Sequence, residues 1–279
     1  MRINFYLLFV IAFVSLQSNC YASVSPDTSG ILLASNKTEY CVETIKSNVV
    51  FPELLKAHEE ASLHYIEQFS VSRRAYIIRM YQKSKKYFTR IQTIFKKYGV
   101  PEEYCVLIAL ESAFNPNAIS SAGAVGYWQF MENVAKEYGL KTLSLSELKK
   151  PAVKPVKGKH VPTDDRKNFI KSTYAAAKYL RDRSINLTND PLLIAASYNW
   201  GVGNVWNRLE RTGKKDAGFW DIKNQLPAET RTYVMNFIAL NVLFLNYEKF
   251  YKKELHFYDK TIQIPIDAIS GSTQTSSSL

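Results

Sequence analysis

The chain has 279 residues, of which 46% are hydrophobic, and it carries a formal net charge of +11. This length and composition favour a packed globular body with one sizeable core. The charge favours a polyanionic partner such as nucleic acid, an anionic membrane face or an anionic wall polymer. No zinc-finger, bZIP or RNP-like pattern accompanies that charge, which argues against nucleic acid as the partner.

Residues 1–22 have the pattern of a secretory signal peptide. Arg2 supplies a positive start, residues 5–16 form an apolar run, and Cys20-Tyr21-Ala22 offers small residues for cleavage. The run is short for a membrane span, although an N-terminal anchor is the alternative. Ser18-Asn19 makes a poor lipobox before Cys20, which argues against a lipid anchor. We therefore expect an exported, periplasmic or envelope-associated protein with no transmembrane span after cleavage.

Two cysteines, Cys41 and Cys105, remain after that cleavage. An exported protein can oxidise them, but the spacing does not decide whether they pair. Burial of Cys105 as a free thiol in its apolar segment is an equally good interpretation. The four histidines have no HExxH or other ligand spacing, so no metal site is predicted.

The first half of the chain predicts helices. Residues 23–50 are a weakly patterned lead-in, followed by a helix over residues 52–69. Apolar residues from Ile77 to Phe95 recur at three- and four-residue steps and predict a second helix that Gly99 ends. A third helix is predicted from Pro101 to the Asn115-Pro116 stop, buried on all faces.

The second half continues the helical pattern. A glycine-containing loop leads to a helix over residues 129–138, and residues 141–165, rich in Lys and Pro, predict a basic surface loop. Asp190-Pro191 predicts a capped helix start. Helices are expected over residues 168–183, 191–199, 203–211 and 229–247, an extended segment over residues 261–266, and a disordered end. The fold class predicted is all-α.

Glu111 is the candidate for acid–base chemistry. It follows the apolar segment CVLIAL at the end of the third predicted helix. Burial disfavours the carboxylate and so raises the pKa, and the negative end of the helix dipole acts in the same direction. A carboxyl that stays protonated can donate a proton to a glycosidic oxygen. Taken alone, Glu111 is equally compatible with a solvated glutamate at a frayed helix end.

Four sequence blocks lie around Glu111. They are ESAFNP at residues 111–116, Ser120 with GYWQFM at 126–131, AASYNWGVGNV at 195–205, and ETRTYV at 229–234. In this order they resemble the family 1 lytic transglycosylases, and among them the membrane-bound transglycosylase D branch. The resemblance covers more than half of the chain. It implies a lysozyme-like catalytic domain, mainly helical, with a helical N-terminal extension.

The resemblance also implies roles for individual residues. Glu111 would be the single catalytic acid and then base, and Tyr198 would direct its hydroxyl at the Glu111 carboxyl. Glu229 and Tyr233 would close the cleft from the last helix. The substrate-binding set it implies is Ser120, Gln129, Met131, Tyr198, Asn199, Glu229 and Tyr233. Core packing is the alternative for Met131 and Tyr233, and Gly126 is interpreted as a backbone turn position.

The implied activity is cleavage of peptidoglycan between N-acetylmuramic acid and N-acetylglucosamine with formation of a 1,6-anhydro ring and no cofactor. Residues 112–131 contain no Asp or Glu, so the matched blocks offer no evident second carboxylate of the kind that hydrolases pair across the bond. A hydrolytic muramidase and a non-catalytic peptidoglycan-binding scaffold remain as alternatives. The partners expected are glycan strands, with cell-envelope machinery as a further one.

The sequence departs from the family pattern at three places. Tyr127-Trp128 stands where the family often has Leu-Met, as in the transglycosylase D branch, and Trp200 stands where it often has Ala. A lysine-rich insertion occupies residues 149–159. The sugar-binding LysM repeats that often follow this domain in that branch have no counterpart. The expected organisation is a signal peptide at 1–22, an N-terminal extension at 23–89, a catalytic domain at 90–250 and a tail at 251–279.

Overall fold

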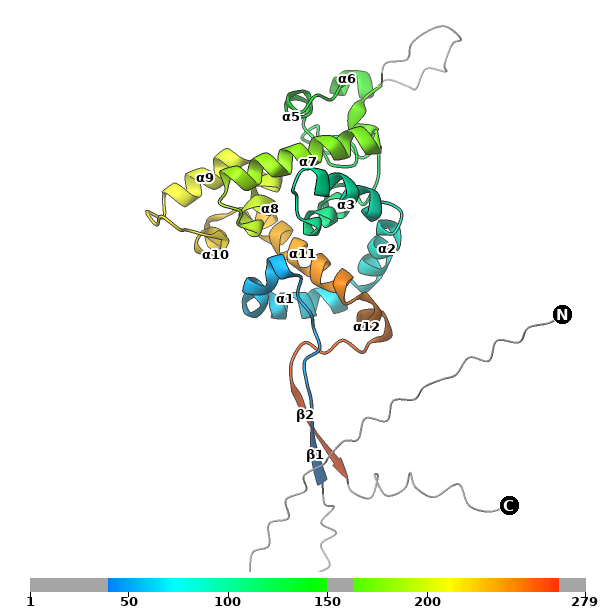
Figure 1. Cartoon of the computed structure of the whole chain (residues 1–279), viewed down its shortest axis with the longest axis vertical. Coiled ribbons are helices and arrows are strands. Elements are labelled where there is room, and N and C mark those ends of the chain that lie inside the picture. Colours follow the sequence, from blue (N-terminus) through cyan, green and yellow to red (C-terminus); the bar gives the residue numbers. More distant parts are fainter. Residues whose placement is uncertain (1–39, 150–162, 266–279) are drawn as a thin grey trace, which may run out of the picture. The chain divides into compact units, whose positions relative to one another are not determined.

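The computed structural model describes residues 40–149 and 163–265 (Figure 1). Several sequence predictions fall outside these residues: the signal peptide at 1–22, the Cys20 anchor, most of the lysine-rich insertion and the disordered C-terminal end. The described chain divides into two units, one that contains Ser47–Tyr258 and one that contains the segments before and after it. Each unit is described by itself.

The smaller unit holds a two-stranded antiparallel sheet. Strand β1 (Tyr40–Ile45) pairs with β2 (Lys260–Pro265), with Cys41 opposite Ile264. The extended segment predicted at residues 261–266 is therefore confirmed. Strand β1 was not predicted, because it is the last part of a weakly patterned lead-in and finds its partner far away in the sequence. Cys41 is a half-buried free thiol in this strand.

The first helices of the larger unit are shorter than the periodicity predicts. A 3₁₀ turn, η1 (Glu53–His58), leads into α1 (Glu59–Ser72), where a single helix was predicted. The predicted second helix is two helices, α2 (Arg74–Ser84) and α3 (Phe88–Lys97), separated by a turn at residues 85–87. Apolar residues continue across that turn because both helices face the same core. Periodicity alone therefore did not reveal the break.

The catalytic candidate lies at the end of the next helical segment. The predicted third helix consists of a 3₁₀ turn, η2 (Glu102–Val106), and α4 (Leu107–Ser112). It ends at Ala113, before the Asn115-Pro116 stop, because Ala113 adopts the left-handed conformation. Cys105 is a buried free thiol in η2, as one of the two interpretations held.

The remaining helices follow the predicted order with shifted ends. Asp190 caps α8 by accepting hydrogen bonds from the backbone N–H groups of Leu192 and Leu193, as the Asp190-Pro191 pair predicted. Five short elements, α6, η3, α10, η4 and α12, were not predicted. The bounds are α5 (Glu132–Glu137), α6 (Leu145–Leu148), η3 (Asp165–Lys167), α7 (Phe169–Asn186), α8 (Pro191–Trp200), α9 (Val202–Glu210), α10 (Phe219–Ile222), η4 (Lys223–Gln225), α11 (Ala228–Leu245) and α12 (Tyr247–Lys252).

Helix α11 is the central element of the helical unit (Figure 1). Residues 234–243 of this helix are buried except for Asn236, which is half-buried. The helix packs against α1, α8 and α4. The N-terminal part of α11 keeps an exposed or half-buried face with Glu229, Thr232, Tyr233 and Asn236. These four positions follow three- and four-residue steps, so they share one side of the helix.

The prediction of a mainly helical fold is confirmed. Because α1 and α2 pack against α11, the helices before residue 90 belong to the same compact unit as the segment that carries Glu111. Across the described residues, none of the helices is both long enough and apolar enough to cross a membrane.

Candidate active site

Glu111 sits at the last turn of α4, whose preceding residues Leu107, Ile108 and Ala109 are buried. The chain then turns sharply, since Ala113 and Phe114 both have positive φ, 50° and 64°. Two consecutive non-glycine residues in that region store strain, which the surrounding contacts must hold. Lys83 of α2 supplies one such contact by donating to the carbonyl oxygen of Ala113 at 2.9 Å.

The Glu111 carboxyl has one oxygen bound and one open. The Tyr233 hydroxyl of α11 donates to Oε1 of Glu111 at 2.5 Å. No described residue bonds the other oxygen, Oε2, and that atom is not among the buried polar atoms that lack a partner. Oε2 therefore reaches solvent and is the oxygen that a substrate can approach.

The surroundings of Glu111 favour its neutral form. Burial, the largest cause, raises the pKa of Glu111 to about 8. The hydrogen bond from Tyr233 acts in the opposite direction, because it stabilises the carboxylate, while the negative charge of Glu229 adds to the rise. At neutral pH the group is thus mostly protonated and able to donate a proton, which is the property a general acid needs.

Glu229 is a second carboxylate on the same side of α11 as Tyr233. Its side chain is exposed and it makes no hydrogen bond to Glu111, yet its charge acts on the Glu111 carboxyl. The sequence blocks suggested no evident second carboxylate near Glu111. In the structure, Glu229 supplies such a carboxylate from a distant block, one helical turn before Tyr233.

The loop at residues 126–130 (the 126–130 loop) is packed tightly against the rest of the site. Gly126 has φ +81°, and a Cβ there would lie 2.1 Å from the carbonyl oxygen of Arg166. Only glycine fits both conditions, which supports its interpretation as a turn position. Gln129 is also left-handed, with φ 49°. The backbone on this side of Glu111 is therefore strained and closely packed.

Three helices hold the 126–130 loop through hydrogen bonds. Ser112 of α4 donates to the carbonyl oxygen of Tyr127 at 2.8 Å, and the indole of the fully buried Trp128 donates to Thr173 of α7 at 3.1 Å. Tyr198 of α8 donates to the carbonyl oxygen of Trp128 at 2.8 Å. The Tyr198 hydroxyl therefore donates to the loop and not to Glu111, although the Glu111 charge acts on it, and a role of Tyr198 in orienting the carboxyl stays a prediction. Helix α8 places that hydroxyl under the loop, and α11 supplies the hydroxyl that reaches Glu111.

The other predicted substrate residues take part in local structure. The Ser120 hydroxyl accepts from the backbone N–H of Ala124 at 3.0 Å, and the Gln129 amide donates to the carbonyl oxygens of Ala118 and Gly126. Asn199 accepts from the Thr230 hydroxyl at 2.8 Å, which links α8 to α11. Met131 is 43% exposed, so core packing does not account for it. Contact of these four residues with a sugar stays a prediction.

Sequence analysis missed the buried pair Asp164 and Arg166. Arg166 is 1% exposed and bonds Asp164 through Nη2 at 2.6 Å and Nε at 2.9 Å. Its guanidinium also donates to the carbonyl oxygens of Phe130 and Leu143. The pair anchors the end of the 126–130 loop. The pair follows a lysine-rich segment in sequence, so Asp164 was assigned to the predicted surface loop at residues 141–165 and Arg166, which comes directly after it, was given no role.

Within the described ranges, no group of three or more His, Cys, Asp or Glu side chains could hold a metal ion. The chemistry that the site offers is proton transfer at the Oε2 atom of Glu111. Tyr233 holds the other oxygen of Glu111 by a hydrogen bond. Ser112, the residue after Glu111, bonds the 126–130 loop and so keeps the loop next to the turn that carries the carboxyl.

Comparison with known proteins identifies the central segment. Residues 90–220 match the family described as the transglycosylase SLT domain. The chain is 30% identical over 171 residues to membrane-bound lytic murein transglycosylase D of Escherichia coli strain K12, which covers 60% of this chain and 33% of that protein. The same protein of E. coli O6:H1 matches equally. The match thus spans about a third of the length of these curated relatives.

Two solved structures are similar at lower identity. An inactive mutant of lytic transglycosylase Slt from Pseudomonas aeruginosa shares 22% identity, covers 61% of this chain and 25% of that chain, and has a TM-score of 0.42. The 70-kDa soluble lytic transglycosylase of E. coli shares 19% identity, covers 73% of this chain and 38% of that chain, and has a TM-score of 0.43.

Proposed function

We propose that the protein is a peptidoglycan lytic transglycosylase, because residues 90–220 match the transglycosylase SLT domain. It cleaves the β-1,4 bond between N-acetylmuramic acid and N-acetylglucosamine and forms 1,6-anhydro-muramic acid. The observation that carries the proposal is the Glu111 carboxyl, which is kept neutral by burial, held at Oε1 by Tyr233 and open at Oε2. A protein that only binds glycan has no use for such a group.

The proposed reaction uses Glu111 twice. Its Oε2 proton passes to the glycosidic oxygen while the bond from that oxygen to C1 of muramic acid breaks. The substrate's N-acetyl group stabilises the positive charge at C1. The Glu111 carboxylate then takes the proton of the C6 hydroxyl, whose oxygen bonds C1 and closes the anhydro ring. Water is not consumed, and Glu111 returns to its protonated form.

Glu229 supports a second candidate, a hydrolytic muramidase. In that reaction Glu111 is the acid, and the Glu229 carboxylate activates a water or stabilises the charge at C1. Glu229 is exposed and its charge acts on a Glu111 carboxyl that burial keeps neutral, which is the arrangement that a pair of catalytic carboxylates requires. The two candidates share the substrate and the acid, and they differ in the product.

We also propose that the protein acts in the cell envelope. The pattern of residues 1–22 supports export by a signal peptide, and the curated relatives are named membrane-bound murein enzymes. Glycan strands are the proposed partner, with envelope machinery as a further one. The positive net charge suits an anionic wall polymer.

The test is mass spectrometry of the soluble products from peptidoglycan sacculi incubated with residues 23–279. Fragments that end in anhydro-muramic acid are expected, one water lighter than hydrolysed fragments. The Glu111→Gln variant should keep its fold and sacculus binding and release no fragments. Reducing-end fragments would instead establish the muramidase, and release by Glu111→Gln would overturn both. Glu229→Gln should keep anhydro products, whereas a muramidase would lose its turnover.

A further inference from the structure

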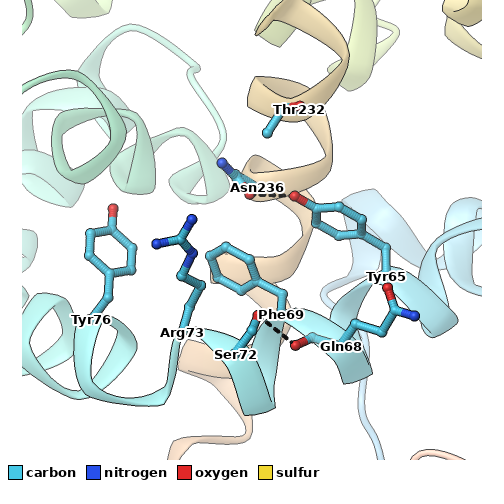
Figure 2. Close-up of a pocket in the computed structure, with 8 residues that line it drawn as sticks. All are labelled: Tyr65, Gln68, Phe69, Ser72, Arg73, Tyr76, Thr232 and Asn236. Carbon is cyan, nitrogen blue, oxygen red and sulfur yellow. Dashed lines mark hydrogen bonds between the residues drawn. The ribbon is translucent and has the colours of Figure 1, made fainter. Parts of the chain in front are cut away.

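A pocket of about 350 Å³ lies between α1, the start of α2 and α11 (Figure 2). In Figure 2 the side chains of Phe69, Arg73 and Tyr76 extend from α1 and α2 toward α11, which carries Thr232 and Asn236. The volume is within the range of sites that bind small organic groups. Most of the pocket is formed by residues that precede the segment matched to the SLT domain.

Both walls of this pocket continue to Glu111. On α11, Thr232 and Asn236 line the pocket, and Tyr233, on the same side of the helix, bonds the Glu111 carboxyl. On α2, Tyr76 lines the pocket, and Lys83 bonds the carbonyl oxygen of Ala113, two residues after Glu111. Tyr76 and Lys83 are two helical turns apart, about 10 Å. The pocket therefore lies along the same stretches of α2 and α11 that contact Glu111 and the turn after it.

The pocket has the electrostatics of an anion site. Arg73 is the one charged residue among the eight that line it, and none of the eight is Asp or Glu. Arg73 is exposed, its backbone bonds Phe69 and Ile77, and its guanidinium makes no salt bridge or hydrogen bond with any described residue. Its positive charge acts on the Tyr65 and Tyr76 hydroxyls, whose pKa it lowers against the larger effect of burial. The guanidinium is thus free to pair with a ligand.

The positive charge extends from the pocket toward Glu111. One side of α2 carries Tyr76, Arg79 and Lys83, which follow at three- and four-residue steps. Arg73, directly before the helix, continues the same spacing. Opposite them, the pocket offers the Asn236 amide, which accepts from Tyr65 at 2.7 Å and keeps its own N–H groups for a ligand, and the exposed Thr232 hydroxyl. A carboxylate next to aromatic faces and amide donors suits this set.

We propose that this pocket binds the acidic peptide stem of the glycan strand that Glu111 cleaves, with Arg73 paired to a stem carboxylate. The proposal rests on the proposed function, because it takes the strand at Glu111 as the source of the peptide. Stem peptides are attached through the lactyl group of muramic acid and carry free carboxylates beyond it, whereas a strand without stems carries only the lactyl carboxylate on each muramic acid. Arg73 is then a specificity residue that distinguishes peptide-substituted strands from bare ones.

The test measures binding, so that it does not depend on turnover. The full chain with Glu111→Gln is titrated with soluble glycan strands that carry their stems, and with the same strands after an amidase has removed them. Adding Arg73→Gln should weaken binding of the stem-bearing strands about ten-fold, as expected for one charge-assisted pair, and leave the bare strands within about two-fold. Arg73→Lys should restore most of the affinity.

Arg90→Gln is the matched control, since Arg90 is an exposed arginine of α3 without a described partner. It should change neither titration. Equal weakening of both ligands by Arg73→Gln would show that the pocket binds the sugar or its lactyl carboxylate, and no weakening of either would show that it binds neither. Both results overturn the proposal while the proposed function stands. If the Glu111→Gln chain binds neither strand and the unsubstituted chain releases no fragments, the proposed function fails first.

Discussion

The two sides of the Glu111 carboxyl are built in different ways. On one side, the turn at Ala113 and the 126–130 loop contain residues with positive φ angles. The polar groups of the loop are hydrogen-bonded to α4, α7 and α8. On the other side, α2 and α11 are regular helices, with Arg73 and Glu229 exposed and Tyr76 and Tyr233 half-buried at or next to their ends. The first side determines where the carboxyl lies, and the second determines its pKa and its ligand. Substitutions on the first side should therefore lower stability, whereas substitutions on the second should change the pH profile or ligand binding.

The largest effect is expected from Gly126→Ala on the loop side. The added methyl meets the Arg166 carbonyl oxygen at 2.1 Å, and φ is +81°. We expect a loss of more than about 3 kcal/mol of unfolding free energy, measured by urea denaturation. Gly213→Ala is the control, since Gly213 has φ +66° with nothing near its Cβ, and it should cost about 1 kcal/mol. Equal costs would mean that the Arg166 contact contributes nothing.

Glu111→Gln should stabilise the fold at neutral pH while it removes activity. Because the pKa of Glu111 rises to about 8 on folding, folding is penalised as pH rises from the ordinary carboxyl range toward 8, and not below it. The amide removes this penalty and still accepts from Tyr233. We expect a gain on the order of 2 kcal/mol at pH 7 that disappears at pH 4, measured by urea denaturation. The same gain at both values would assign it to packing.

The two tyrosines give the most direct test of the comparison. Tyr198→Phe removes the bond to the Trp128 carbonyl and should cost about 1 kcal/mol of stability. It should leave the alkaline limb of the kcat/KM profile in place. Tyr233→Phe should lower kcat about ten-fold and move that limb to higher pH, because the lost bond favours the carboxylate. Opposite behaviour of the pair would reverse the roles given to the two hydroxyls.

Glu229→Gln should have the smallest effect. Its charge raises the pKa of Glu111, so its removal moves the alkaline limb to lower pH, and the shift should shrink at high salt. The kcat/KM profile measures this. Glu132→Gln, on α5 and paired with Lys136, should leave the limb unchanged. A Glu229→Gln variant with an unmoved limb would remove Glu229 from the electrostatics of the site.

Sequence analysis reached the parts of this site that depend on local pattern. The buried position of Glu111 follows from the apolar segment before it, and the special role of Gly126 from its place in a turn. The Asp190 cap follows from the Asp-Pro pair. Each of these needs only a few neighbouring residues.

What sequence analysis missed depends on how helices pack. Tyr198 and Tyr233 lie in separate matched blocks, and which hydroxyl reaches Glu111 is decided by the placement of α8 and α11. The turn between α2 and α3 keeps the apolar period of a single helix. Arginine is usually found on the surface, so the sequence gives no sign that Arg166 is buried. Its burial depends on the hydrogen bonds of its guanidinium to Asp164 and to nearby carbonyl oxygens.

The contacts of Asp164, Asp165 and Arg166 also bear on how this protein can change. The Leu143 N–H donates to the Asp164 carboxylate, and Arg166 donates back to the Leu143 carbonyl oxygen. The Asp165 N–H donates to the Lys141 carbonyl oxygen, and the Lys141 N–H donates to the Asp165 carboxylate. These bonds close the chain at both ends of the segment between residues 143 and 164, independently of its length. Evolution can therefore lengthen, shorten or recharge that segment without disturbing proton transfer at Glu111. For the same reason, it is the place to insert a reporter domain.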